Sequence, residues 1–184
     1  MNSEREILGP PIPTGILFVG GIHGVGKSTF CRHFSQLHRI PHYSCSTIIE
    51  QTKNIKFSEN KQTHDVCGNQ RDLINAIELI KQLNGNFLLD GHFCLRDVNG
   101  NINEIETDVF KNIMPSVIII LEAEPADILK RRPEMGMSLE EIEQFLKKET
   151  TRALEISDAL NVPIYRAALS DCGNTYSFSP INKG

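Results

Sequence analysis

Residues 15–29 read GILFVGGIHGVGKST, and this stretch decides the fold. From Gly21 to Ser28 it matches the pattern GxxxxGK(S/T). Glycines at these places let the backbone turn sharply, so that successive N–H groups can point at a phosphate. The pattern follows an apolar run that is typical of a buried strand, and Phe30 and Phe34 follow it at helical spacing. The sequence therefore predicts a strand, a nucleotide-binding loop and a helix, in that order.

Lys27 and Ser28 carry the chemistry of this loop. Lys27 supplies a positive charge for the β- and γ-phosphates of the nucleotide, and Ser28 supplies a hydroxyl ligand for Mg²⁺. The helix that follows adds its unpaired N–H groups and its positive end. His23 either approaches the phosphates or packs on its neighbours. The residues expected to contact the nucleotide are Gly21, His23, Gly24, Val25, Gly26, Lys27, Ser28 and Thr29.

The rest of the chain repeats the alternation of strands and helices. Buried strands are predicted over residues 87–90 and 116–121, and a short last strand over residues 162–165. The segment 97–101 contains Asn-Gly and predicts a tight hairpin turn, because this pair favours the primed turns. Strands that alternate with helices form a parallel, doubly wound sheet, which binds ligands at the carboxyl ends of its strands.

Two helix starts can be read from single residues. Pro125 suits the first turn of a helix, where its missing N–H costs nothing. Ser138 and Glu141 form the capping-box pattern before a long helix that ends near Leu160. With 184 residues the chain is long enough for one domain. We expect a flexible lead-in over residues 1–14, one domain over 15–166 and a loosely held tail over 167–184.

Composition excludes several classes of protein. The net charge of −4 argues against a general nucleic-acid binder, since such proteins usually carry a basic excess. The five cysteines are scattered and odd in number, which does not fit a disulfide framework. The longest strongly apolar run, residues 117–121, is too short to cross a membrane. We expect a cytoplasmic protein that binds neither membranes nor, in general, nucleic acid.

Charged residues outside the loop indicate phosphoryl transfer. Asp90 ends a predicted strand, where it either holds a Mg²⁺-bound water, orients an acceptor or caps a turn. Arg131, Arg132 and Arg152 are cations that could meet charge on a transferring group. Glu149 lies on the apolar stripe of the long helix beside Arg152, so the two residues either form a structural ion pair or both line a site. No Asn-Lys-x-Asp segment, which would read guanine, is present.

The loop, the LLDGH segment at residues 88–92, the pair Arg131-Arg132 and the helix that carries Arg152 together resemble the P-loop nucleoside monophosphate kinases. The sequence is most similar to the archaeal-type adenylate kinases and related bacterial ATP-binding proteins, over residues 15–166. The resemblance implies a three-layer P-loop NTPase fold with a central parallel sheet and a short lid. It also implies ATP bound at the loop, with Mg²⁺ at Ser28 and Asp90.

The same resemblance implies an acceptor site between the segment after the first helix and the helix near Gln70. Ser44 and Ser46 occupy the acceptor stretch, Gln70 would face the acceptor base, and His92 matches the histidine of the related Asp-x-His strand end. Arg131 and Arg132 would be lid arginines near the phosphates. No arginine is present to clamp a monophosphate in the acceptor region, and we assign that task to Lys61.

We therefore predict an ATP-dependent phosphotransferase whose small-molecule acceptor is a nucleoside monophosphate. The predicted catalytic residues are Lys27, Asp90, Arg131, Arg132 and Arg152. A first alternative is a kinase for another small molecule or a nucleic-acid end, in which Asp90 or a neighbour acts as base on a hydroxyl. A second alternative is an ATP-binding regulatory module or slow ATPase, in which nucleotide occupancy switches the interface to a protein partner.

Overall fold

Six strands form the central sheet, in the order β2-β3-β1-β6-β7-β8. The structure is a computed structural model that describes residues 14–59, 66–97, 99–169 and 176–181. The first five strands of the order pair in parallel, and β8 pairs antiparallel with β7. The six strands are β1 (Gly15–Gly20), β2 (His42–Ser44), β3 (Asn86–Asp90), β6 (Pro115–Leu121), β7 (Ile164–Leu169) and β8 (Tyr176–Pro180).

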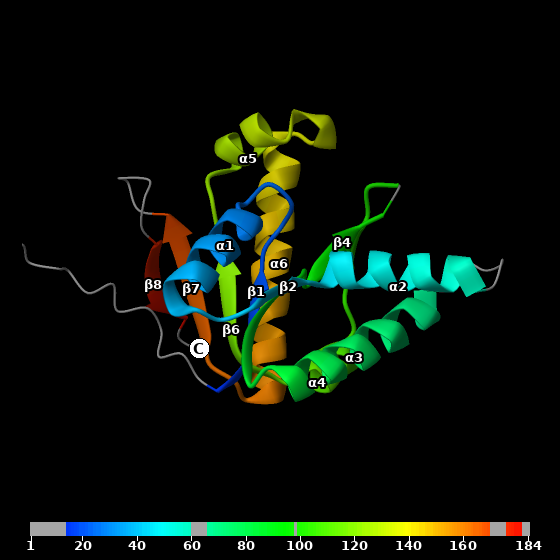
Figure 1. Cartoon of the computed structure of the whole chain (residues 1–184). Helices are drawn as coiled ribbons and strands as arrows, with labels where there is room; N and C mark the ends of the chain where they lie inside the picture. The colour runs from blue at the N-terminus through cyan, green and yellow to red at the C-terminus, as the bar shows by residue number, and fades with distance from the viewer. Residues whose placement is uncertain (1–13, 60–65, 98, 170–175, 182–184) are drawn as a thin grey trace, which may run out of the picture.

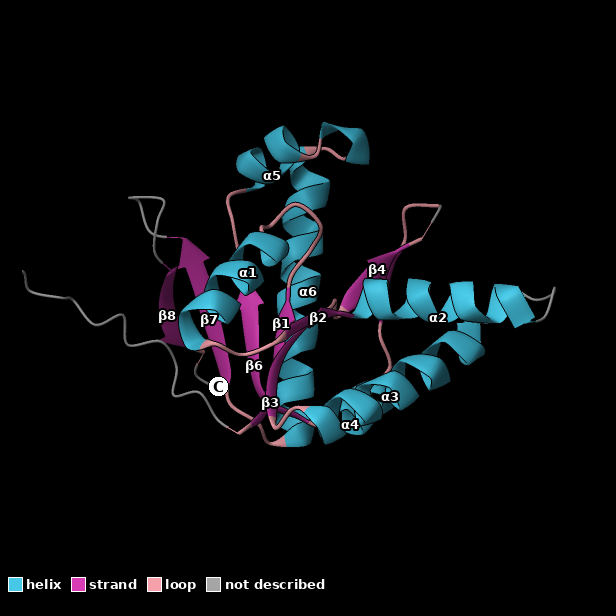
Figure 2. Ribbon diagram, in the orientation of Figure 1, coloured by secondary structure: helices cyan, strands magenta, loops and turns pink. Residues whose placement is uncertain are grey.

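Helices cover both faces of this sheet, so that the fold has three layers (Figure 1). The helices are α1 (Lys27–His38), α2 (Cys45–Glu59), α3 (Val66–Leu83), α4 (Thr107–Ile113), α5 (Pro125–Arg131) and α6 (Leu139–Leu160). A short 3-10 helix, η1 (Pro133–Met135), connects α5 to α6. Figure 2 shows α1 on one face of the sheet and α6 on the other. The predicted α/β fold with a central, mostly parallel sheet and a short lid is confirmed.

The alternation of side chains along β1 divides the core between the two faces. Leu17 and Val19 pack in one hydrophobic cluster with Phe30 of α1. Ile16 and Phe18 pack in the other cluster, with residues of α3, α4 and the second half of α6. All four β1 side chains are almost fully buried. Because successive side chains of a strand point to opposite faces, a central strand covered on both sides must be apolar throughout.

Both predicted helix starts are confirmed. Pro125 is at the start of α5. The Ser138 hydroxyl accepts from the N–H of Glu141, whose carboxylate in turn accepts from the N–H of Ser138, which completes the capping box of α6. The helix ends at Leu160 as predicted, because Asn161 adopts the left-handed conformation that stops it. In the part of the chain that the structure describes, no helix is long and apolar enough to span a bilayer.

The end of the sheet differs from the prediction. The last parallel strand, β7, begins at Ile164 and continues to Leu169, so it is displaced toward the tail from the predicted 162–165. The segment after it contains β8, which extends the sheet. Tyr176 and Phe178 of β8 pack on Phe30 of α1, with ring centroids 4.8 and 6.0 Å apart respectively. The expectation of a loosely held tail is therefore wrong for Tyr176–Pro180.

A separate hairpin, β4 (Cys94–Arg96) and β5 (Ile102–Glu104), follows the central strand β3. The expected hairpin is present, but its turn is not of the primed kind. Gly100 has a φ of 89°, whereas Asn99 is not among the residues of positive φ. The Asp97 carboxylate instead accepts from the N–H groups of Asn99 and Asn101, and these bonds close a longer turn.

Candidate active site

The glycine-rich loop, residues 21–26, connects the end of β1 to the start of α1. Gly24 and Gly26 have φ angles of 85° and 107°, which side chains with a Cβ rarely adopt. Space excludes a side chain as well, since a Cβ at Gly24 would lie 2.9 Å from Cγ of Arg132. The loop thus has the sharply turned backbone that the pattern predicts.

Lys27 is buried at the first position of α1, with 8% of the residue exposed. Its Nζ donates to the backbone carbonyl oxygens of Gly21 and Ile22, so the ammonium group lies against the loop. Burial lowers the pKa of Lys27 to about 8, although the carboxylates of Glu149 and Asp90 raise it. Near neutral pH the loop therefore encloses a positive charge.

Glu149 of α6 binds the backbone of the glycine-rich loop and of the segment after β3. Its Oε1 accepts from the N–H groups of Gly21 and Phe93, each at 3.0 Å, and its Oε2 accepts from the N–H of Cys94 at 2.7 Å. The residue is only 1% exposed. Burial raises the pKa of Glu149, while these hydrogen bonds and the charge of Lys27 lower it. One carboxylate therefore joins the loop to the segment that leads from β3 into the hairpin.

Asp90, at the end of β3, is bound by two side chains from the edge strand β2. His42 Nε2 lies 2.6 Å from Asp90 Oδ2, and the Ser44 hydroxyl donates to Asp90 Oδ1 at 3.2 Å. The Ser46 hydroxyl lies 3.0 Å from that of Ser44. These contacts join Asp90 to side chains of the predicted acceptor stretch, whereas a turn-capping role would require bonds to backbone N–H groups.

The ring of His92 contacts that of His23 in the loop, with ring centroids 4.4 Å apart and the two planes tilted by 43°. Burial, together with the neighbouring Lys27 and His23, lowers the pKa of His92 to about 2. Burial and Lys27 also lower the pKa of His23. Among the described residues, His92 Nδ1 has no hydrogen-bond partner. The structure thus places a neutral imidazole beside the loop, with one buried nitrogen that no described residue satisfies.

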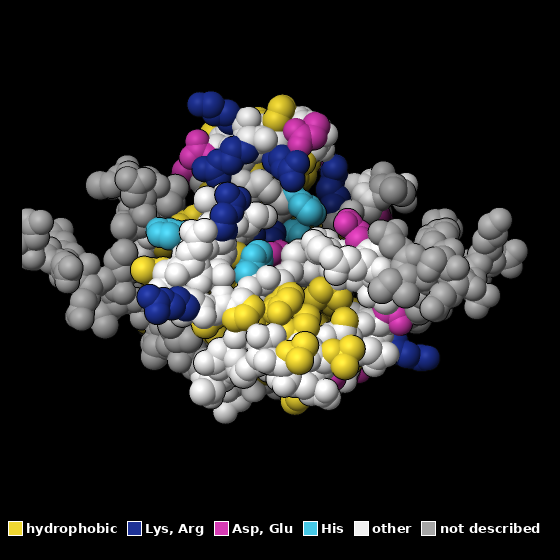
Figure 3. Space-filling model, viewed as in Figure 1, with side chains coloured by type: hydrophobic (Ala, Val, Ile, Leu, Met, Phe, Trp, Pro, Cys, Tyr) yellow, Lys and Arg dark blue, Asp and Glu magenta, His cyan; other side chains and the backbone are white. Residues whose placement is uncertain are grey.

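Arg131 and Arg132, the predicted lid arginines, lie beside the loop. Arg131 Nη1 donates to the carbonyl oxygen of Gly24 at 3.2 Å. Arg132 packs on Gly24 and forms an ion pair with Glu134 at 2.9 Å. Figure 3 shows Lys and Arg side chains gathered over α5 and toward α1. Asp and Glu side chains lie among them at the same end of this face.

Arg152 does not reach the loop. Its guanidinium group donates to the carbonyl oxygen of Ile105 at 2.9 and 3.2 Å and to the Thr107 hydroxyl at 3.0 Å. Its carboxylate partners are Glu104 and Glu155. Both predicted roles of Arg152 are corrected: the residue fastens α6 to the segment between β5 and α4, and its ion-pair partners do not include Glu149.

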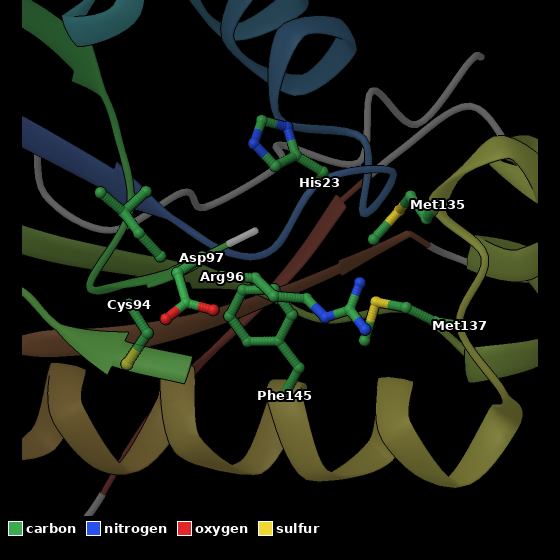
Figure 4. A pocket seen from close by; sticks show the side chains of 8 residues that line it. His23, Cys94, Arg96, Asp97, Met135, Met137 and Phe145 are labelled. Carbon is green, nitrogen blue, oxygen red and sulfur yellow. The ribbon is translucent and has the colours of Figure 1, made fainter. Parts of the chain in front are cut away.

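A cavity of about 230 Å³ opens between the glycine-rich loop, the β4–β5 hairpin and residues 125–137, which comprise α5, η1 and the turn after them and are called the lid. Figure 4 shows His23 on the side of the loop, Met135 and Met137 on the side of the lid, and Phe145 rising from α6. The Arg96 side chain extends from the hairpin into this space toward Met137. Its guanidinium group is 3.5 Å from the carboxylate of Glu141. The cavity thus combines apolar walls with the polar side chains of Arg96, His23 and Asp97.

The structure brings together some of the predicted acceptor residues. Ser44 and Ser46 are adjacent to Asp90, and His92 is adjacent to the loop. Lys61 lies outside the described residues, and for Gln70 the structure describes only the backbone, within α3. The predicted contacts of Lys61 and Gln70 therefore remain predictions.

Three residues of the site are absent from the sequence-based prediction in these roles: His42, Arg96 and Glu149. Glu149 has a visible signal, because it is a carboxylate on an apolar helix stripe. Arg96 belongs to the predicted hairpin, whose position over the loop cannot be read from the sequence. His42 precedes the acceptor stretch by two residues, and no spacing rule connects it to Asp90.

The residues of this site fit a triphosphate and Mg²⁺. Three glycines of positive φ turn the loop, and Lys27 places a buried ammonium group against it. Ser28 and Thr29 are exposed in the first turn of α1, where a hydroxyl can meet a metal ion, whereas Val25 is buried and packs in the core. Asp90 adds a carboxylate at the end of the neighbouring strand. Oxygen ligands of this kind are those that Mg²⁺ prefers.

Fold and site together define a P-loop kinase-like protein. The chain belongs to the AAA domain family, whose model matches residues 20–145. The resemblance to P-loop kinases that the sequence motifs predict is confirmed by this match.

Comparison with individual proteins gives the following similarities. An adenylate kinase from Pyrococcus horikoshii is 29% identical over 125 residues, which make up 64% of this chain and 64% of that enzyme. Shikimate kinase from Bacteroides thetaiotaomicron has a TM-score of 0.46 at 16% identity, covering 80% of this chain and 81% of its own. A gluconokinase from Sinorhizobium meliloti 1021 has a TM-score of 0.43 at 13% identity, covering 81% of this chain and 94% of its own.

Proposed function

We propose that this protein transfers the γ-phosphoryl group of ATP to a nucleoside monophosphate. The observation that carries the proposal is the enclosure of a buried lysine by a sharply turned glycine loop, with arginines of a short lid beside it. The similarity to an adenylate kinase, which spans 64% of that enzyme, supports the same class of acceptor.

In this mechanism the chain acts by positioning and by charge. Lys27 exchanges its bonds to the carbonyls of Gly21 and Ile22 for bonds to the phosphates, and Arg131 approaches them from the lid. Mg²⁺, held by Ser28 and Asp90 when bound, neutralises phosphate charge. A monophosphate acceptor is already an anion, so no protein base is needed.

The cavity is the proposed acceptor site. A ligand there would touch the loop through His23 and the lid through Met135 and Met137, whose apolar side chains exclude water. Arg96 would bind the anionic group of the acceptor in exchange for its pairing with Glu141 at 3.5 Å. We therefore propose Arg96 as a cation for the acceptor phosphate, in addition to the Lys61 that the sequence predicts.

One observation favours a second candidate, a kinase for a small hydroxylated acceptor. His42 and Ser44 hold the Asp90 carboxylate at the strand end, where it could accept a hydroxyl proton. The cavity volume of about 230 Å³ is also below the range of roughly 300–1,000 Å³ usual for ligand pockets. A small acceptor fits this space without movement of the lid.

Transfer of labelled phosphate from γ-labelled ATP to a panel of acceptors tests the proposal. The panel holds the nucleoside monophosphates, the nucleosides and a set of small polyols and hydroxy acids. Label on a monophosphate supports the first candidate, and label on a hydroxyl of the other acceptors supports the second. Nucleotide binding with no transfer to any acceptor contradicts both and favours a regulatory ATP-binding module.

Two variants control this assay. Lys27→Ala should lower the rate of transfer by about 10²–10³-fold, because it removes the charge enclosed by the loop. Lys148→Ala, an exposed position on α6, is the matched loss of a lysine and should leave transfer unchanged. Transfer by Lys27→Ala at the wild-type rate would exclude the loop as the site of the reaction.

A further inference from the structure

Three side chains of different chemistry lie close together near Lys27. Cys31 of α1, His42 of β2 and Asp90 of β3 each offer a ligand atom, and these atoms all lie within 4.8 Å of one another. The three residues come from neighbouring elements that the parallel sheet brings together. Within the described ranges, no other group of three such ligands meets this criterion.

The donor set is unlike a magnesium site. Mg²⁺ takes oxygen ligands, whereas a thiolate, an imidazole and a carboxylate together suit Zn²⁺ and the other late divalent transition metals. Three protein ligands leave a fourth tetrahedral position for water. The distance of 2.6 Å from His42 Nε2 to Asp90 Oδ2 is a hydrogen bond, so the two groups must separate slightly to admit a metal between them.

The surroundings support the ligands. Ser44 donates to Asp90 Oδ1, which leaves Oδ2 directed at His42 and at the centre of the cluster. Such outer-shell hydrogen bonds commonly orient metal ligands. Cys31 is fully buried, but the His42 side chain is 24% exposed and gives access from solvent. Burial raises the pKa of the Cys31 thiol, so the thiol keeps its proton until a metal displaces it.

We propose that Cys31, His42 and Asp90 form a binding site for Zn²⁺ or a similar transition-metal ion. On binding, the Cys31 thiol loses its proton to solvent and a metal–sulfur bond forms, His42 binds through Nε2, and Asp90 through Oδ2. Lys27 is close enough to influence Cys31, so its positive charge opposes the metal and limits the affinity. Given the proposed function, the ion would take Asp90 from its role with Mg²⁺ and inhibit transfer.

Cobalt titration of the full chain, without nucleotide, tests the site. Co²⁺ bound to a thiolate gives a charge-transfer absorption that is independent of any kinase activity, so a failure of this proposal is distinguishable from a failure of the proposed function. We expect the absorption to saturate at about one equivalent and to disappear when Zn²⁺ is added. Cys31→Ser should lose the absorption entirely.

Matched variants complete the experiment. Cys94→Ser changes another buried free cysteine outside the cluster and should keep the absorption. Ser44→Ala, which removes the outer hydrogen bond, should weaken cobalt binding by about 10–100-fold. Thermal unfolding shows that each variant is folded. Absence of the absorption in the wild type, or its persistence in folded Cys31→Ser, would overturn the proposal.

Discussion

The candidate site has two kinds of charged groups: the buried pair Lys27 and Glu149, called the floor, and the exposed arginines Arg96 and Arg132, called the wall. In the floor, Lys27 and Glu149 are 8% and 1% exposed, and their bonds go to backbone groups of the loop and of the segment after β3. In the wall, the side chains of Arg96 and Arg132 are 30% and 50% exposed, and each pairs with a surface carboxylate.

This difference separates two tasks. A buried charge that loses its partner costs several kcal/mol, so Lys27 and Glu149 are held in one arrangement before a ligand binds, and Lys27 would leave its carbonyl partners only for the charge of a phosphate. Exposed ion pairs contribute about 0–1 kcal/mol, so the arginines of the wall can leave their carboxylates for a ligand anion at little cost. The floor is therefore preorganised for phosphate, whereas the arginines of the lid and of the hairpin can exchange their carboxylate partners for a ligand anion.

The largest expected effect follows from removing the charge of the floor. Lys27→Ala should lower the rate of phosphoryl transfer by about 10²–10³-fold, as is typical when one preorganised donor to a developing charge is lost. Label transfer at saturating ATP measures this. A loss of less than tenfold would show that the floor is not where the reaction is stabilised.

Glu149→Gln should be next in size, because an amide cannot replace the carboxylate. Its NH₂ group would face a backbone N–H that now has an acceptor, and the variant should lose about 2–3 kcal/mol of unfolding free energy. Urea unfolding measures the change, and the exposed Glu143→Gln is the control. If the two variants were equally stable, the buried Glu149 would contribute no more to the unfolding free energy than an exposed glutamate, which would contradict the prediction.

The buried His92 predicts an acid dependence of stability. Its pKa is about 2 in the fold and 6.5 when unfolded, so between these values the unfolded chain binds more protons. The free energy of unfolding should therefore fall as pH drops below 6.5, by up to about 1.4 kcal/mol per pH unit. Urea unfolding at several pH values should show a shallower slope in His92→Asn. Parallel slopes would contradict the burial of a neutral imidazole.

The smallest effect on stability is expected in the wall. Arg96→Ala should change the unfolding free energy by less than about 1 kcal/mol, because its ion pair with Glu141 is exposed. The same variant should raise the KM for the acceptor and leave the KM for ATP unchanged. A large loss of stability, or an effect on ATP alone, would show that Arg96 belongs with the floor.

Local rules account for the parts of the fold that the sequence predicts. The loop pattern, the apolar runs of β1, β3 and β6, and the capping box at Ser138 each depend on residues close together in the chain. Strand β8 also has a local signal, since Tyr176 and Phe178 alternate with serines, but a period of two over five residues is short enough to miss.

Contacts between distant segments account for what the sequence does not predict. Glu149 accepts from the N–H groups of Gly21, Phe93 and Cys94. Every residue except proline has a backbone N–H, so the sequence does not reveal which ones Glu149 binds. Arg152, three residues further along α6, donates instead to the carbonyl oxygen of Ile105, because three residues move a side chain about 4.5 Å along the helix and about 60° around it. Two neighbours on one helix stripe therefore have different roles, and periodicity alone cannot assign them.

Strand β8 has a consequence for any shortened form of this chain. Its aromatic side chains cover Phe30 and Phe34, which stand on the same helix as Lys27 and Ser28. A chain cut after residue 166 would lose the second half of β7 together with β8, uncover these rings and leave an open sheet edge, which invites aggregation. Strand β8 thus covers the helix that begins the candidate nucleotide site, and truncation after residue 166 should destabilise that helix.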